Sequence, residues 1–89
     1  MKKMPKMLLD DCIESCRKFW SSGNRSLLYP MHEKAETLGK EIGVDAFTLT
    51  DFISAIVKGH GICPDAENDE IYCAFRVLGW DVVEEKGGG

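Results

Sequence analysis

Apolar residues recur at helical spacing along much of this chain, and the densest such stretch lies near its centre. Between Phe47 and Val57 the apolar side chains follow steps of one, three and four, the period of a helix with one buried face. Thr48, followed three residues later by Asp51, resembles a capping box with aspartate in place of the usual glutamate or glutamine. We therefore expect a short, deeply buried helix over 47–58, against which the other helices pack.

Three further amphipathic helices are predicted around the central one. Pro5 suits the first turn of a helix because it has no N–H to leave unpaired, and the apolar stripe behind it predicts a helix over 5–21. A proline and a glycine bound a second helix over 30–42, and acidic residues favour the first turns of a last helix over 66–78. The expected core consists of Leu8, Leu9, Cys12, Ile13, Cys16, Phe19, Met31, Leu38, Ile42, Phe52, Ile53, Ile56, Ile71, Phe75 and Leu78.

The segments outside these helices carry separate predictions. Residues 1–4 are expected to be a frayed start, and 26–29 a turn whose apolar side chains fold inward. A glycine before Trp80 fits a left-handed helix cap with a hydrophobic residue folded back onto the helix end. Val82 and Val83 are expected to add a short extended segment.

Length and composition favour one globular domain. The 89 residues, 44% hydrophobic and 29% charged, can bury a modest core and do not indicate disorder. Apolar runs stay below the roughly 18 residues that a membrane span needs. The apolar run that follows the first lysines is interrupted by two aspartates, unlike that of a secretory signal. We expect an all-α, compact four-helix single domain over 1–83, a disordered glycine-rich tail over 84–89, and a cytoplasmic protein with reduced thiols.

Three of the four cysteines, with one histidine, raise the question of a metal site. Cys12 and Cys16 are four residues apart on one helical face, and His60 and Cys63 are three apart in a predicted loop, which together make a Cys3His set that zinc accepts. Both helical cysteines, however, lie in the apolar stripe, where free cysteine behaves as a small buried hydrophobe. The tight Cys-x2-Cys spacing of typical zinc sites is also missing. Core packing is therefore favoured, zinc is the alternative, and no cofactor is expected.

Catalysis and calcium binding lack a matching signature in the sequence. Cys63 and His60 are close enough in sequence to suggest a nucleophile and a base, but no catalytic motif surrounds them. Acids at positions 65, 67 and 69 have the rhythm of an EF-hand loop, yet its sixth and twelfth positions, which should be glycine and glutamate, are Glu70 and Arg76. No enzyme is expected.

Two glycines four residues apart, Gly39 and Gly43, lie where the second and third predicted helices meet. The apolar residues around them are Leu38, Ile42, Val44, Leu49 and Phe52. With this pattern, residues 35–54 resemble the helix-turn-helix motif of small DNA-binding repressors. The resemblance implies a transcriptional regulator whose second helix reads the major groove. The basic residues that would contact phosphates are Lys2, Lys3, Lys6, Arg17, Lys18 and Arg25.

The charge of the chain, −4 overall, is unevenly distributed. Residues 1–34 hold seven Lys or Arg against four acids, whereas 35–89 hold four against eleven. An acidic field repels nucleic acid and attracts basic partners, although acids also serve simply to keep a small protein soluble. The second helix of the resemblance would moreover present Asp45 and Asp51, and no basic residue, to DNA.

These observations favour a small non-catalytic protein–protein interaction or regulatory module that acts through an acidic surface. One form would be an inhibitor of the phage or mobile-element type that occupies a basic, nucleic-acid-handling partner. The alternative is a helix-turn-helix DNA-binding regulator. The residues expected to bind the partner are Asp65, Glu67, Asp69, Glu70, Asp45 and Asp51.

Overall fold

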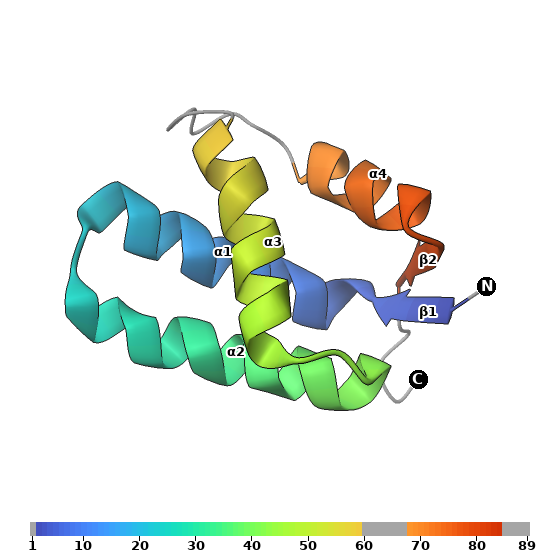
Figure 1. The fold of residues 1–89 in the computed structure, drawn as a ribbon, viewed down its shortest axis with the longest axis horizontal. Coiled ribbons are helices and arrows are strands. Elements are labelled where there is room, and N and C mark those ends of the chain that lie inside the picture. Colours follow the sequence, from blue (N-terminus) through green and yellow to red (C-terminus); the bar gives the residue numbers. More distant parts are fainter. Residues whose placement is uncertain (1, 60–67, 85–89) are drawn as a thin grey trace.

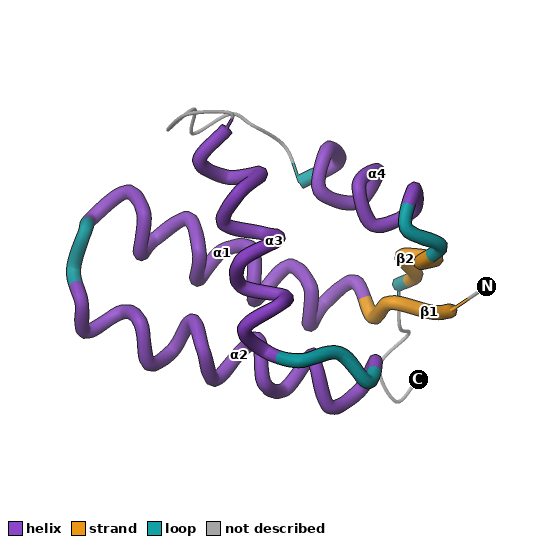
Figure 2. The backbone as a smooth tube through the Cα atoms, viewed as in Figure 1, coloured by secondary structure: helices purple, strands orange, loops and turns teal. Residues whose placement is uncertain are grey.

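The computed structural model describes residues 2–59 and 68–84. These residues form four α-helices, a 3₁₀ turn and one pair of short strands (Figure 1). In chain order the elements are β1 (Lys2–Pro5), α1 (Lys6–Ser22), η1 (Arg25–Leu27), α2 (Leu28–Ile42), α3 (Ala46–Gly59), α4 (Asp69–Val77) and β2 (Trp80–Val83). The mostly helical fold is confirmed. The all-α expectation is not fully met, because β1 and β2 form a small parallel sheet, drawn in orange in Figure 2.

Helices α1 and α2 form an antiparallel hairpin that α3 crosses (Figure 1). Gly23, in the left-handed conformation at φ 67°, ends α1, and the side chain of Asn24 accepts a hydrogen bond from the backbone N–H of Ser26 at 3.0 Å. The left-handed glycine and the asparagine hydrogen bond together reverse the direction of the chain within a few residues. The predicted ends of the first two helices near 21 and 42 agree with the structure to within one residue.

The start of α2 differs from the prediction. The helix begins at Leu28, so Pro30 lies inside its first turn, where a missing N–H leaves no bond unmade. Leu28 and Tyr29, expected to fold inward from a turn, are instead helical and exposed. The inward prediction was wrong for both because apolar character does not say which face of the helix a residue will occupy.

A short turn joins α2 to α3 and brings the two helices into backbone contact. Gly43 is left-handed at φ 74°, and its N–H and that of Val44 both donate to the carbonyl of Gly39. A Cβ built on Gly39 would lie 2.3 Å from the carbonyl oxygen of Val44, so only glycine fits there. Asp45 then caps α3, since its Oδ2 accepts hydrogen bonds from the backbone N–H groups of the second and third residues after it, at 3.0 and 3.2 Å. The predicted cap at Thr48 was therefore wrong by one turn.

The first and last described elements, β1 and β2, pair in parallel, from Lys2↔Trp80 to Pro5↔Val83. The expected frayed start is thus a strand, and its Met4 is fully buried. The left-handed glycine cap before Trp80 is confirmed, because Gly79 has φ 95° and Trp80 is buried. Residues 60–67 and 85–89 lie outside the described residues, and with them the start of the helix expected over 66–78 and nearly all of the expected tail.

A small polar network holds α4 against α1. Asp10 accepts hydrogen bonds from the hydroxyl of Tyr72 and from Asn68, and Asn68 in turn accepts one from Arg17 at 3.0 Å. Burial, followed by the bond to Asp10, raises the pKa of Tyr72 above its ordinary value of 10.0. On the apolar side, the Phe52 ring of α3 packs edge-on against Phe75 of α4, with ring centroids 4.8 Å apart.

The core lies where α1, α2 and α3 meet and continues under β1, β2 and α4. Most of the predicted core is buried or packed against it, but Leu78 was wrong, since it is exposed at the end of α4. The buried hydrophobic residues that the prediction missed are Met4, Ala35, Leu49, Tyr72, Trp80 and Val82. No helix in the described ranges has both the length and the apolar content to cross a membrane.

Replacing Gly39 with alanine should lower the free energy of unfolding by about 2 kcal/mol, because the new methyl group must displace the turn backbone. Glycine to alanine inside a helix ordinarily stabilises by about 1 kcal/mol, so the sign itself is diagnostic. Thr37→Ala on the exposed face of α2 is the control. Urea unfolding measures both, and a Gly39→Ala variant as stable as the wild type would contradict the close contact.

Candidate functional site

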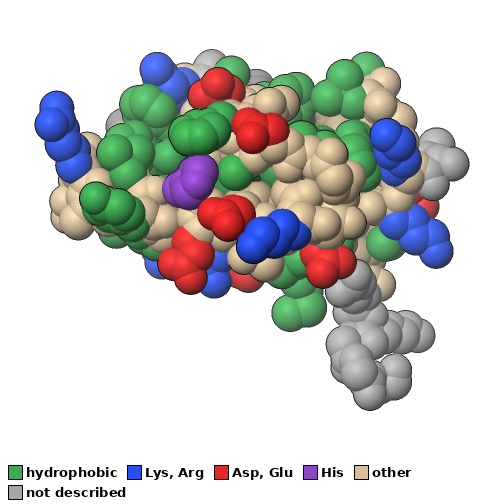
Figure 3. All heavy atoms as spheres, turned by 60° about the horizontal axis from the view of Figure 1, so that its bottom comes forward, with side chains coloured by type: hydrophobic (Ala, Val, Ile, Leu, Met, Phe, Trp, Pro, Cys, Tyr) green, Lys and Arg blue, Asp and Glu red, His purple; other side chains and the backbone are tan. Residues whose placement is uncertain are grey.

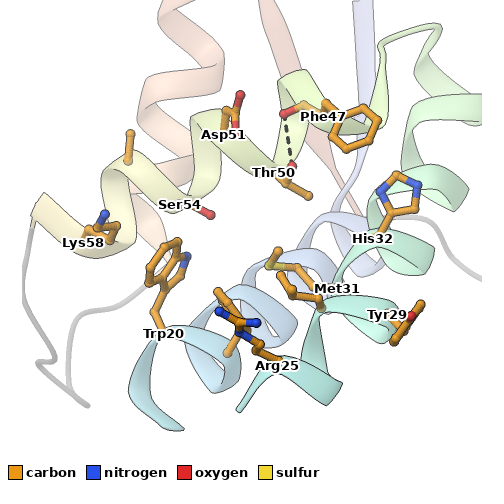
Figure 4. A pocket seen from close by; sticks show the side chains of 13 residues that line it. Trp20, Arg25, Tyr29, Met31, His32, Phe47, Thr50, Asp51, Ser54 and Lys58 are labelled. Carbon is orange, nitrogen blue, oxygen red and sulfur yellow. Dashed lines mark hydrogen bonds between the residues drawn. The ribbon is translucent and has the colours of Figure 1, made fainter. Parts of the chain in front are cut away.

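A groove of about 1060 Å³ lies between α3 and the loop end of the α1–α2 hairpin (Figure 4). Its lining residues are Phe19 and Trp20 from α1, Arg25 from η1, Leu28, Tyr29, Met31 and His32 from α2, and Phe47, Thr50, Asp51, Ser54, Ala55 and Lys58 from α3. All of them lie on helices, so the groove has rigid walls.

One face of helix α3 packs into the core and another lines the groove, which is why a groove exists beside the core. One face buries Leu49 and Ile53. The groove-lining residues of α3 recur at steps of three and four from Phe47 to Lys58, which places them on one stripe of the same helix. That stripe carries small and polar side chains at its middle, so α3 leaves space over the hairpin instead of filling it.

The two hydroxyls on the floor of the groove are buried and already bonded. Thr50 Oγ1 donates to the carbonyl of Phe47 at 3.0 Å, and Ser54 Oγ donates to Cys16 Sγ at 4.0 Å. Neither of these bonds is to a base, which a nucleophilic hydroxyl requires. The hydrogen-bond donors of both hydroxyls are therefore engaged within the chain.

Large apolar side chains surround the groove and remain exposed to solvent. The exposed fractions are 81% for Tyr29, 66% for Phe47, 40% for Leu28 and 38% for Trp20. The Phe47 ring stacks at a tilt on His32, with centroids 5.0 Å apart, so α2 and α3 share one aromatic wall. Four large apolar side chains that line the groove are thus in contact with solvent.

Positive charge gathers at one end of the groove. Lys58 Nζ lies 4.4 Å from the centroid of the Trp20 ring, close enough for a cation–π contact, and Arg25 lines the groove from the hairpin turn, nearer to Trp20 than to Phe47 in Figure 4. Figure 4 shows Lys58 and Trp20 at one end, and Phe47 and His32 at the other. Within the described residues neither Arg25 nor Lys58 forms an ion pair, whereas Asp51 is the single carboxylate of the lining.

The acidic residues predicted to bind a partner are placed in separate parts of the fold. Asp69 and Glu70 are exposed in the first turn of α4, where negative charge is favourable to the helix dipole. Asp45 directly precedes α3, whose first turn lies away from α4 in Figure 1, and Asp51 follows six residues later within α3. The other two predicted residues, Asp65 and Glu67, lie outside the described residues.

The outer face of α2 also carries no single sign of charge. Figure 3 shows acidic, basic and hydrophobic side chains interleaved over this face. Part of the pattern is a ladder at helical spacing, in which Glu36 approaches both His32, at 3.7 Å, and Lys40, at 3.4 Å. Such exposed pairs contribute little to stability, but Lys40 offsets the charge of Glu36 locally.

Most of the basic residues that a DNA contact would use are engaged within the chain. Lys6 pairs with Glu84 at 3.1 Å and Lys18 with Glu14 at 3.2 Å. Lys2 lies over the Trp80 ring, and Arg17 donates to Asn68, as described above. Among residues 2–59 and 68–84, Lys3 and Arg25 are the two of the six that form no ion pair, side-chain hydrogen bond or cation–π contact.

The cysteines of α1 are core residues in the structure. Burial raises the pKa of Cys12 to about 12, with smaller contributions from Cys16 and Asp11, and burial likewise raises the pKa of Cys16 to about 11. Neutral thiols are poor nucleophiles and poor metal ligands. In the described part of the chain, no three metal-ligating side chains come together, and the remaining zinc candidates, His60 and Cys63, lie outside it.

Comparisons with known proteins leave the fold and the groove as the basis for inference. No protein-family model, no curated protein and no solved structure matches this chain. The groove residues that the sequence interpretation missed, above all Trp20, Leu28 and Tyr29, did carry a signal. They are large apolar residues close to the Ser and Gly that end α1 or to the proline in the first turn of α2, where a helix hairpin has the least core to bury them in.

Asp45 and Asp51 should respond differently to substitution because only Asp45 caps α3. Asp45→Ala should lower the free energy of unfolding by about 1 kcal/mol. Asp51→Ala, its matched control on the same helix, should change it by less than about 0.5 kcal/mol. Thermal and urea unfolding give both values, and equal effects would refute the capping role.

The buried thiols should make the protein sensitive to alkali. Their pKa values are raised on folding, so the stability they contribute is complete below the ordinary value of 9.0 and is lost as the pH rises towards about 11 and 12. We expect the urea midpoint to fall between pH 9 and 11. A Cys12→Ala/Cys16→Ala variant should be less stable at pH 8 but show a flatter decline, and an unchanged decline would exclude the thiols as its cause.

Proposed function

We propose that this chain is a non-catalytic protein-interaction module whose docking surface is the groove between α3 and the α1–α2 hairpin. The observation that carries the proposal is the ring of exposed apolar side chains, Tyr29, Phe47, Leu28 and Trp20, around one concave surface. In water such a ring is unfavourable, and covering it by a partner removes apolar area from solvent.

The residue types support a protein as the partner. Trp and Tyr are enriched among the residues that contribute most to binding, because they bury large area while losing few rotamers. The groove-lining residues are held on helices whose other faces form the core, so little order has to be gained on binding. Bonded hydroxyls on the floor favour binding over catalysis.

An acidic surface remains a second candidate for the same class of function. Asp69 and Glu70 are exposed at the start of α4, next to the segment that holds Asp65 and Glu67. A basic, nucleic-acid-handling partner would be attracted there, as expected for an inhibitor of the phage or mobile-element type. This version of the proposal requires the charges on α4, whereas the groove version does not.

DNA binding through α2 and α3 is the alternative from a different class. The left-handed Gly43 and the close approach of Gly39 to Val44 support a helix-turn-helix geometry. Against it, α3 presents Phe47 and Asp51 on its exposed stripe, and its cation Lys58 lies in the last turn, away from the N-terminal residues that read base edges. The interaction module therefore ranks first.

The groove proposal is tested with two matched pairs of exposed residues. Tyr29→Ser/Phe47→Ser removes apolar side chains that are 81% and 66% exposed at the groove, and Val77→Ser/Leu78→Ser removes side chains that are 86% and 61% exposed on α4. In quantitative affinity capture from native lysate, the groove variant should lose partners at least tenfold, since each anchor is worth on the order of 1–2 kcal/mol. The α4 control should retain them.

A third variant, Asp69→Lys/Glu70→Lys, separates the two versions of the proposal. Loss of capture by this variant with retention by the groove variant would assign the docking surface to α4. Equal capture by all the variants and the wild type would refute an interaction surface at either place. Circular dichroism of each variant checks that the helices are intact.

A further inference from the structure

We infer that the groove takes an amphipathic helix whose apolar face is flanked by carboxylates at one end. The inference rests on the proposed function, because it names the partner class for the same groove. It follows from three features of the described residues: the backbone of the walls, the length of the α3 stripe, and the placement of Arg25 and Lys58.

The backbone of the walls selects a helical occupant. Every lining residue belongs to α1, η1, α2 or α3, whose main-chain groups bond mostly within their own helices, and the lining contains no strand edge. An extended segment laid in the groove would leave many of its backbone N–H and C=O groups without partners, because the walls offer no strand edge to pair with. A helix satisfies those groups internally and exposes only side chains.

The length of the groove matches a short helix. The eleven steps from Phe47 to Lys58 rise about 16 Å along the axis of α3, which is about three turns. A partner helix of that length presents apolar anchors at positions i, i+4 and i+7. Met31 on one wall and Ser54 on the opposite wall leave room for such anchors between the Trp20 end and the Phe47 end (Figure 4).

The charged residues that line the groove determine which end of a bound helix should carry carboxylates. Arg25 and Lys58 lie near the Trp20 end and make no ion pair with a described residue, whereas Asp51 is the one carboxylate of the lining. Carboxylates on the partner near Trp20 would therefore meet two cations, while lysines would meet the same charges unfavourably. A second copy of this chain would bring its own Arg25 and Lys58, which disfavours self-association through the groove.

A displayed helix library provides the probe. Each member is an 18-residue helix with leucine at four positions of heptad-like spacing and with flanking positions randomised among Asp, Glu, Lys, Arg, Gln and Ser. Selection uses the wild-type chain, with counter-selection on Tyr29→Ser/Phe47→Ser and with Val77→Ser/Leu78→Ser as the matched control. We expect the enriched helices to carry Asp or Glu on one end, and their binding to weaken as salt is raised.

Charge reversal in the protein gives the decisive comparison. Arg25→Glu/Lys58→Glu should weaken binding of an enriched acidic helix about tenfold and strengthen its Glu→Lys counterpart, which is the expected scale for a few rim charges. The control reversal, Lys34→Glu/Lys40→Glu on the exposed face of α2, should leave both affinities within about twofold.

The outcomes separate the inference from the function on which it rests. Groove-dependent helices with neutral or basic flanks would overturn the charge assignment and leave the groove as the docking surface. A dimer that the Tyr29→Ser/Phe47→Ser variant dissolves would make the occupant a second copy and overturn the inference. The absence of any groove-dependent helix would overturn both the inference and the proposed function.

Discussion

The contact between the backbone of Gly39 and the carbonyl of Val44 is the constraint on which the rest of the structure depends. It lets α2 pass directly against the turn that leads into α3, and so determines where α3 crosses the hairpin. A side chain at this position would push the turn outward and shift α3 along with it. The core under α3 and the groove beside it would both change, because one helix forms a side of each.

Much of the helical architecture could be predicted from the sequence, whereas the strands and the groove could not. In long amphipathic segments the helical spacing of the apolar residues can be seen in the sequence, which is why α1, α2 and α3 were placed to within a few residues. The strands are four residues each, too short for a period, and β1 pairs with a segment almost eighty residues away. Nothing local distinguishes Lys2–Pro5 from a loose end.

The groove could not be predicted from the sequence for a different physical reason. Leu28 and Tyr29 are as apolar as any core residue, and whether they are buried depends on where α3 crosses, which is a tertiary fact. The same limit applies to Asp45 and Asp51, since both looked like surface acids. One of them is committed to the N-terminus of α3 through two hydrogen bonds. A cap can be recognised from sequence only when the first helical residue is already known.

In the proposed interaction, the charge expected of the partner changes sign when it is inferred from the groove instead of from the composition of the chain. Residues 35–89 are strongly acidic in total, yet Lys58, one of their four basic residues, lines the groove, as does Arg25 from the other half of the chain. Screening limits exposed charges to a range of about 8 Å at physiological salt, so a docking helix responds to these two cations more than to acids elsewhere. Meanwhile Lys6 and Lys18, which made the first half look basic, are neutralised by carboxylates beside them. Because the local field decides what binds in a groove, an acidic protein can present a site for an acidic partner.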